Sequence, residues 1–134
     1  MSGDYMNTFF TIAPGPQEGK VLSEIQIDKI RIHDVERAII FSTNEKDVSS
    51  KLSDEILSLN LECEVIKLSS LTTQGMEDST QLRSTPWKIA NEMVSAYRDV
   101  GNAITMHGRG TRLHSHLLWV VANSFGSKSV SWDG

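Results

Sequence analysis

The chain has 134 residues, of which 39% are hydrophobic and 22% are charged, and its formal net charge is −4. This length fits one domain around one ordinary core, so we expect a single unit over residues 1–134 and exclude extensive disorder. The acidic balance excludes a domain that coats long nucleic acid through a basic surface, and the single cysteine excludes a disulfide scaffold.

The sequence carries no signature of a membrane or secreted protein. No apolar run approaches the roughly 18 residues that a membrane-spanning helix needs. The chain begins MSGDYMNTFF, which lacks the cationic stretch that precedes the apolar part of a secretory signal. We therefore expect a cytoplasmic protein in a reducing compartment, without a membrane partner.

The N-terminal part of the chain predicts a strand, a helix and a second strand. Residues Asn7–Ala13 are rich in aromatic and β-branched residues, which favours a strand, and the proline-rich segment Pro14–Pro16 ends it. Residues Gly19–His33 carry both a helical and an alternating apolar pattern. We predict a helix because a crossover between parallel strands fits the rest of the chain, with a pair of strands as the alternative. The apolar run Arg37–Ser42 predicts the second strand.

The middle of the chain predicts another helix and another strand. Apolar residues recur every three or four positions from Val48 to Leu59, which is the pattern of one helical face. Asn44 is suited to cap this helix, and Asp47 would then lie at its third position, where a carboxylate is favourable. The segment Glu64–Leu68 predicts the third strand.

The next segments predict a loop, a helix and a strand. Residues Ser69–Ser79 are polar and favour a loop. Thr85 followed by Pro86 indicates a helix start, because proline suits the first helical position. This helix should continue to about Val100 and end at the Gly101–Asn102 pair, before a short strand. That strand is expected at Ala103–Met106.

The C-terminal part predicts a helix over Leu113–Phe125, closed by Gly126, and a fifth strand over Lys128–Trp132. The helix has apolar residues on most sides. One helix of so small a domain cannot usually bury its whole circumference, so we expect part of it to form a symmetric dimer interface.

Strands that alternate with helices define the expected fold class. We predict an α/β protein, a three-layer Rossmann-like sandwich with a mostly parallel sheet of about five strands. Ligands of such sheets bind beyond the carboxyl ends of the strands. The segments to inspect are therefore Thr11–Gln17, Ser42–Asn44, Ser69–Thr73 and Met106–Arg112.

The turn between the fourth strand and the last helix carries the most chemistry. Its glycines allow backbone N–H groups to approach an anion, its two arginines suit phosphate, and it offers one hydroxyl and one histidine. These residues are His107, Gly108, Arg109, Gly110, Thr111 and Arg112. The spacing is not that of a Walker loop. A tight turn with solvated arginines is the alternative to an anion or nucleotide site.

The other candidate ligand-binding residues follow the first three strands. They are Ala13, Pro14, Gly15, Thr43, Ser69 and Ser70. The alternatives are a rigid connection after the first strand and a solvated loop after the third. His114 and His116 lie two positions apart on a helix and share no face, so we expect no metal site, and we expect no cofactor.

The stretch Thr105–Arg112 (TMHGRGTR) resembles a motif of the CARF family, the CRISPR-associated Rossmann fold. Members of that family typically show a turn of the form Asn/Ser/Thr-x-Thr/Ser-Gly-Gly-Thr/x-Lys/Arg after their fourth strand. Here Arg109 stands where the family usually has a glycine, and His107 or Gly108 replaces the hydroxyl before the glycines. The loop Ala13–Gln17 is similar in position to the family's other ligand-contacting segment.

The resemblance implies a homodimer whose two loop sets form one pocket on a two-fold axis. The ligand would be a cyclic oligoadenylate, the second messenger of type III CRISPR antiviral immunity. Some members of the family also cleave this ring slowly, with the ribose 2′-hydroxyl as nucleophile and without a metal. His107, Arg109 and Thr111 are then the candidate catalytic residues.

Two other functions fit the same residues. The first is a small phosphosugar or mononucleotide enzyme, in which the turn holds one phosphate and His107 acts as acid or base. The second is a non-catalytic protein-interaction domain, which predicts an exposed apolar patch around Trp119 or Trp132.

Overall fold

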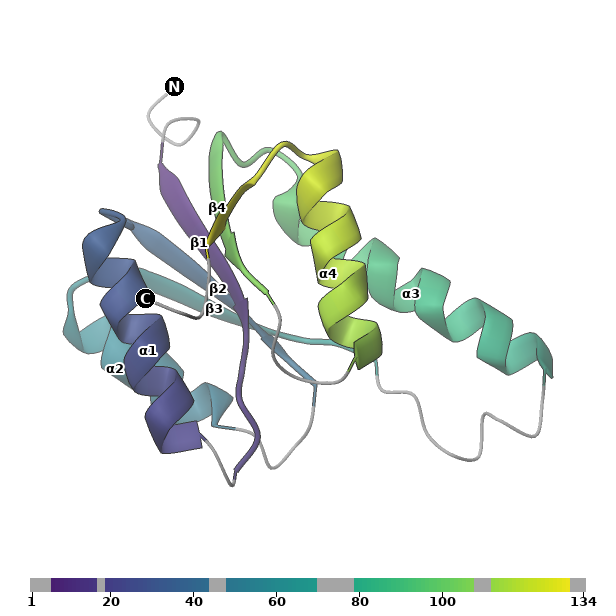
Figure 1. The fold of residues 1–134 in the computed structure, drawn as a ribbon, viewed down its shortest axis with the longest axis horizontal. Coiled ribbons are helices and arrows are strands. Elements are labelled where there is room, and N and C mark those ends of the chain that lie inside the picture. The colour runs from purple at the N-terminus through teal and green to yellow at the C-terminus, as the bar shows by residue number, and fades with distance from the viewer. Residues whose placement is uncertain (1–5, 17–18, 44–47, 70–78, 108–111, 131–134) are drawn as a thin grey trace.

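The structure is a computed structural model that describes residues 6–16, 19–43, 48–69, 79–107 and 112–130 (Figure 1). Over these residues, the strands form one parallel sheet with the order β3-β2-β1-β4-β5. The strands are β1 (Asn7–Ile12), β2 (Arg37–Ser42), β3 (Glu62–Lys67), β4 (Asn102–Met106) and β5 (Lys128–Val130). The helices are α1 (Gly19–Ile32), α2 (Ser49–Ser58), α3 (Ser79–Tyr97) and α4 (Arg112–Ser124).

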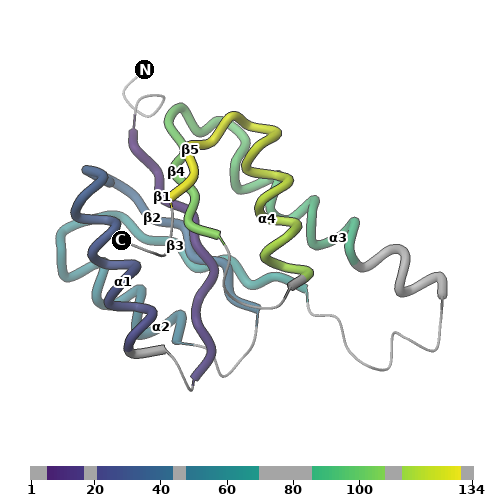
Figure 2. The backbone as a smooth tube through the Cα atoms, viewed as in Figure 1, coloured from purple at the N-terminus to yellow at the C-terminus, as the bar shows by residue number. Residues whose placement is uncertain are grey.

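Helices cover both faces of the sheet, as Figures 1 and 2 show: α1 and α2 lie on one face, α3 and α4 on the other. Successive residues of β1 supply the two cores, because side chains alternate across a strand. Phe9 packs with α1 and α2, whereas Phe10 packs with α3 and α4. Both phenylalanines are fully buried. The expected α/β class and the three-layer Rossmann-like arrangement are confirmed.

The helix prediction for Gly19–His33 is confirmed, with the helix ending at Ile32. Ile27 and Ile30 are buried in the core against the sheet, whereas Ile32 is 69% exposed. The alternating isoleucines therefore belong to different sides of a helix and do not form a pair of strands.

The predicted start of α3 is wrong, because the helix begins at Ser79 and Pro86 lies inside it. Proline fixes its backbone φ at a helical value, so it removes one hydrogen bond but does not force a helix to begin there. The predicted end is also three residues late. The helix ends at Tyr97, and Asp99 takes a left-handed conformation (φ 67°) two residues before the expected Gly101. Gly126 does close α4, with the same φ of 67°.

The predicted start of α2 is wrong as well. Val48 occupies the N-cap position with no side-chain cap, so Asn44 does not cap this helix. The Val48 N–H instead donates to the carbonyl of Pro14 at 3.1 Å, a tertiary contact that no local pattern reveals. Asn44 and Asp47 themselves lie outside the described residues.

Strand boundaries agree with the sequence to within a few residues. β3 begins at Glu62, two residues before the expected Glu64. β5 ends at Val130, and Trp132 lies outside the described residues. Among the described helices, none is long and apolar enough to cross a membrane.

Candidate functional site

The strand order reverses at β1, and this point defines the candidate site. β1 pairs with β2 on one side and with β4 on the other. The chain leaves β1 for α1 on one face of the sheet and leaves β4 for α4 on the opposite face (Figure 1). Connections that diverge in this way open a crevice at the carboxyl ends of the two strands. Since Thr11 lies opposite Met106 in the sheet, Ala13 and His107 follow at neighbouring positions on this edge.

The segment after β1 is held by backbone hydrogen bonds at Ala13 and Pro14 and is exposed at Gly15. The Ala13 N–H donates to the Phe41 carbonyl at 2.9 Å, and the Pro14 carbonyl accepts from Val48. Ala13 and Pro14 are buried, whereas Gly15 is exposed. A Cβ atom added to Gly15 would meet no atom within 4 Å. A methyl group at this position would therefore meet no described atom of the fold.

The segment after β4 places a neutral histidine at the same edge. His107 is half-buried, and its desolvation lowers the pKa of the imidazole below the ordinary value of 6.5. A neutral imidazole can accept a proton and so act as a general base, whereas binding phosphate as a cation would require the protonated ring. Arg112 begins α4, which places the N-terminal end of this helix at the same edge.

Part of the predicted turn lies outside the described residues. Gly108, Arg109, Gly110 and Thr111 belong to this group, as does Ser70 after β3.

The other two described candidates lie further from the reversal point. Thr43 follows β2, and Ser69 follows the edge strand β3. The Ser69 N–H and hydroxyl donate to the two carboxylate oxygens of Glu92, at 2.9 and 3.0 Å. Both donors of Ser69 thus bind to α3. The structure brings together Ala13–Gly15 and His107, but it places Ser69 in a separate contact between β3 and the helices.

His114 belongs to this second contact, which the sequence did not predict. Its Nε2 atom lies 3.5 Å from the Ser69 carbonyl. Burial lowers the pKa of His114, while the Ser69 carbonyl and the Glu92 carboxylate partly oppose this shift. His114 is buried and His116 is exposed, in agreement with their different helix faces. Among the described residues, no cluster of three or more His, Cys, Asp or Glu side chains could hold a metal ion.

A chain of buried polar side chains, which no sequence pattern predicted, connects the two strands at the reversal point. Gln26 of α1 is fully buried, and its Nε2 atom donates to the Thr11 hydroxyl at 2.8 Å and to the Ile12 carbonyl at 3.0 Å. The Thr11 hydroxyl donates in turn to the Met106 carbonyl of β4 at 3.3 Å. The Oε1 atom of Gln26 is buried without a hydrogen-bond partner among the described residues. The same helix also buries Ser23 and Lys29, so Gln26 does not stand out in the sequence as a lone polar residue on an apolar face.

The fold defines a Rossmann-like α/β domain, and its strand order makes the carboxyl ends of β1 and β4 the candidate ligand site. No family model and no curated protein matches the sequence.

Solved structures share the fold at low sequence identity. TcCGT1 in complex with UDP matches with a TM-score of 0.52 and 12% identity, over 94% of this chain and 28% of that one. MurG of Acinetobacter baumannii matches with a TM-score of 0.51 and 9% identity, over 94% of this chain and 34% of that one. The chain thus spans about a third of these proteins or less, and the likeness concerns the fold alone.

Proposed function

We propose that this chain is a CARF-type sensor domain that binds a cyclic oligoadenylate at a homodimer interface. The observation that carries this proposal is the position of β1 beside β4 in the sheet. That order brings the loop after β1 next to the turn after β4, and these are the two segments expected to contact the ligand. Neither segment alone would indicate a nucleotide site. The two segments follow the strands at the reversal point, however, and this is the place where nucleotides bind to such sheets.

The chemistry of the turn suits a phosphate-rich ring. Gly108 and Gly110 carry no side chain that would cover their backbone N–H groups, and Arg109 and Arg112 contribute positive charge to the sequence just before and at the start of α4. A ring with repeated phosphates presents equivalent groups to two such turns, one from each protomer, across a two-fold axis.

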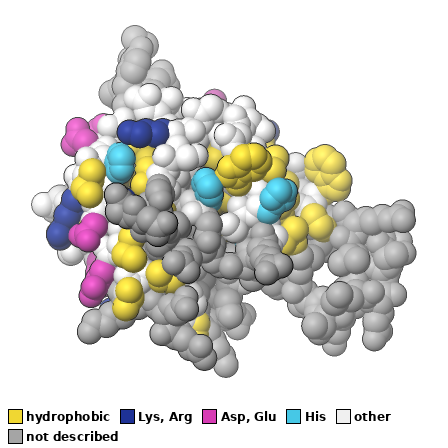
Figure 3. Space-filling view, viewed as in Figure 1, with side chains coloured by type: hydrophobic (Ala, Val, Ile, Leu, Met, Phe, Trp, Pro, Cys, Tyr) yellow, Lys and Arg dark blue, Asp and Glu magenta, His cyan; other side chains and the backbone are white. Residues whose placement is uncertain are grey.

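An exposed apolar surface of α4 supports the dimer. Trp119 and Val120 are 47% and 42% exposed, although the same helix buries Leu118 and Val121 in the core. Figure 3 shows hydrophobic side chains gathered over α4 beside a histidine, and the rings of His116 and Trp119 stack with their centroids 6.3 Å apart. Two copies that cover this surface would bury what one copy leaves in water.

The neutral state of His107 suits slow cleavage of the ring as part of the same proposal. The imidazole would take the proton of a ribose 2′-hydroxyl, whose oxygen then attacks the neighbouring phosphorus. The bond from phosphorus to the 5′-oxygen breaks, that oxygen takes up a proton, and a 2′,3′-cyclic phosphate remains on the opened chain. Arg109 and Thr111 would stabilise the charge that develops on the phosphate.

A thermal-shift panel with matched variants tests the binding proposal. Its ligands are cyclic tri-, tetra- and hexa-adenylate, with linear adenylates and AMP as controls. Saturation at 100 times the dissociation constant stabilises a fold by about 2.7 kcal/mol, which is easily detected. We expect one ring to give this shift, Arg109→Ala to reduce it strongly, and the exposed helix variant Lys88→Ala to leave it unchanged. Equal binding by the parent and by Arg109→Ala would refute the proposed site, and chromatography of the bound nucleotide then reports cleavage.

A second candidate function, a small phosphosugar or mononucleotide enzyme, is favoured by one observation: TcCGT1, which shares the fold, was solved with UDP. UDP and simple sugar phosphates therefore belong in the same panel. A shift with one of them and none with any ring would favour this function. No shift with any ligand would favour a protein-interaction domain.

A further inference from the structure

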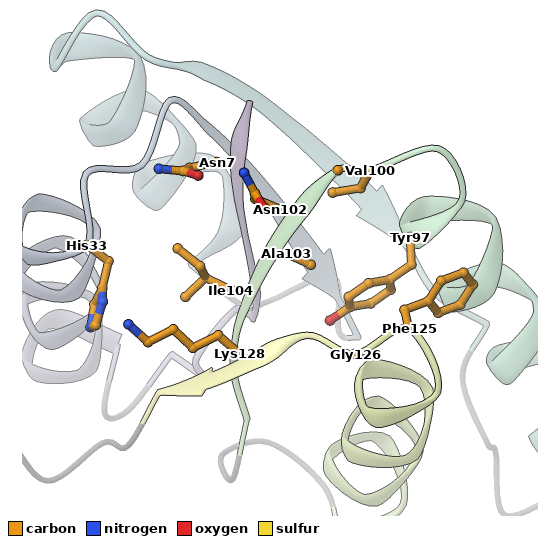
Figure 4. A pocket seen from close by; sticks show the side chains of 11 residues that line it. Asn7, His33, Tyr97, Val100, Asn102, Ala103, Ile104, Phe125, Gly126 and Lys128 are labelled. Atoms are coloured by element: carbon orange, nitrogen blue, oxygen red, sulfur yellow. The ribbon is translucent and has the colours of Figure 1, made fainter. Parts of the chain in front are cut away.

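A second cavity lies at the opposite edge of the sheet, where the strands begin. Its volume is about 460 Å³, which lies within the usual range of small-molecule sites. It extends from the end of α1 at His33, across the first residues of β1 and β4, to the turn before β5 (Figure 4). The crevice proposed for the nucleotide lies at the carboxyl ends of the strands, so the two sites are separate.

The charged side chains that line this cavity are both basic. Among the described lining residues, His33 and Lys128 carry the ionisable basic groups, and none is a carboxylate. Figure 4 shows the amino end of Lys128 directed toward the imidazole of His33. The pKa of His33 is lowered by desolvation and also by the positive charges of Lys128 and Lys29. Two basic groups, His33 after α1 and Lys128 of β5, therefore face one another here. An anion between them would pair with the Lys128 ammonium and would favour the protonated form of the His33 imidazole.

The Glu36 carboxylate near this cavity has another contact, and so does the side chain of the lining residue Asn7. The Glu36 carboxylate accepts a hydrogen bond from the Asn7 N–H at 3.3 Å, and the side-chain amide of Asn7 donates to the Asp34 carbonyl at 3.0 Å. Lys29 and His33 lie at the C-terminal end of α1, which by itself favours positive charge. That explanation does not extend to Lys128, which belongs to β5.

The other end of the cavity is apolar. Val100, Ala103 and the aromatic rings of Tyr97 and Phe125 lie on this side (Figure 4). Tyr97 packs in the core: the centroids of its ring and the Phe10 ring are 3.8 Å apart, and its hydroxyl forms a hydrogen bond with the Thr105 hydroxyl. Phe125 is 43% exposed and offers contact area at the rim.

We propose that this cavity binds a small phosphomonoester with an apolar body. The phosphate would lie between His33 and Lys128, and the apolar body would lie against Val100, Ala103 and Phe125. A dianion matches several basic groups better than a carboxylate does, because each charge-assisted hydrogen bond gains from the full charge.

Titration of the ¹⁵N-labelled full chain with phenyl phosphate, followed by amide NMR spectra, tests this site. We expect shifts at residues 101–104 and 126–128 and a rise in the pKa of His33 when the ligand is bound. Lys128→Gln, an exposed substitution that should not disturb folding, should weaken binding about tenfold, which corresponds to about 1.4 kcal/mol. Lys88→Gln, with an equal loss of charge on α3, should bind like the parent.

Four results would overturn the proposal. The first is an absence of shifts in these two segments, and the second is equal affinity of the parent and Lys128→Gln. The third is tighter binding of benzoate than of phenyl phosphate, which would exclude the phosphate assignment. The fourth is a set of shifts confined to residues 13–15 and 107, which would place the phosphate in the nucleotide crevice. Because the readout uses residues of the amino edge, failure of the nucleotide proposal leaves this test intact.

Discussion

The bond between Gln26 and Thr11 predicts a strong energetic coupling between two substitutions. Thr11→Val keeps the shape of the side chain but removes the oxygen that accepts from Gln26 at 2.8 Å. One amide hydrogen of Gln26 is then left without a partner in a site where both residues are fully buried. An unpaired buried donor costs about 1–3 kcal/mol, so we expect Thr11→Val to lower the free energy of unfolding by about 2 kcal/mol.

Gln26→Leu acts on the same bonds from the other side. It removes the two hydrogen bonds of Nε2 and leaves the Ile12 carbonyl without this donor, but it also removes the unpartnered Oε1 atom. In the double variant, no amide hydrogen remains to be left unpaired. The loss in free energy of unfolding for the double variant should therefore be about 1–2 kcal/mol smaller than the sum of the losses for the two single variants.

Urea unfolding followed by circular dichroism measures all four members of this cycle. For a domain of this size, 1 kcal/mol corresponds to about 3–5 °C in Tm, so thermal scans provide an independent check. Single costs that add to within about 0.5 kcal/mol in the double variant would refute the reasoning, because independent sites behave in this way. A neutral Thr11→Val would refute it as well, since the donor would then have found another partner.

Three further predictions concern the core, the pH dependence and the loop after β1. Tyr97→Phe keeps the stacked ring and loses the hydrogen bond to Thr105, so it should lower the free energy of unfolding in urea by about 1 kcal/mol. Tyr97→Ala should lower it by about 3–5 kcal/mol, because it leaves a cavity in the core. His107 and His114 have lowered pKa values in the fold, so stability should be fully present above the unfolded value of about 6.5 and fall as the pH drops below it. The chain with both histidines replaced by Asn should show a weaker dependence, with only the contribution of His33 remaining, and an unchanged slope of stability against pH would contradict the assignment. Gly15→Ala points a methyl group into open space, so it should leave Tm unchanged or slightly raised. The same substitution should weaken cyclic oligoadenylate binding, as measured by calorimetry. A fall in Tm that accompanies the loss of binding would show that Gly15 is needed for the stability of the fold.

The sequence was sufficient for the elements because apolar periodicity is a local property. The four helices and five strands that the structure describes all correspond to predicted segments. The order of the strands is not local, since β3 is followed along the chain by β4 on the other side of β1. No residue pattern says where such a jump occurs, and it is this jump that places the segment after β1 beside the segment after β4.

The polar contacts were hidden from the sequence for a related reason. The Thr11 hydroxyl meets the Met106 carbonyl across 95 positions, and Ser69 meets Glu92 across 23. Each partner by itself is an ordinary strand or helix residue. Cap signals were misleading where a tertiary bond competes with them, as at Val48, whose N–H is satisfied by the loop after β1 and not by a preceding side chain.

The two edges of the sheet should respond differently to the loss of one positive charge. The proposed nucleotide site lies at the N-terminal ends of α1 and α4, where helix ends favour an anion even when one arginine is removed. The amino edge receives the C-terminal ends of α1, α3 and α4, whose carbonyls repel an anion. A phosphate there gains nothing from a helix N-terminus and depends on side chains, of which Lys128 carries the positive charge. Lys128→Gln should therefore remove a larger fraction of the binding free energy at its site than Arg109→Ala removes at the proposed nucleotide site. Equal fractional losses would show that the helix ends contribute little and that both sites rest on side chains.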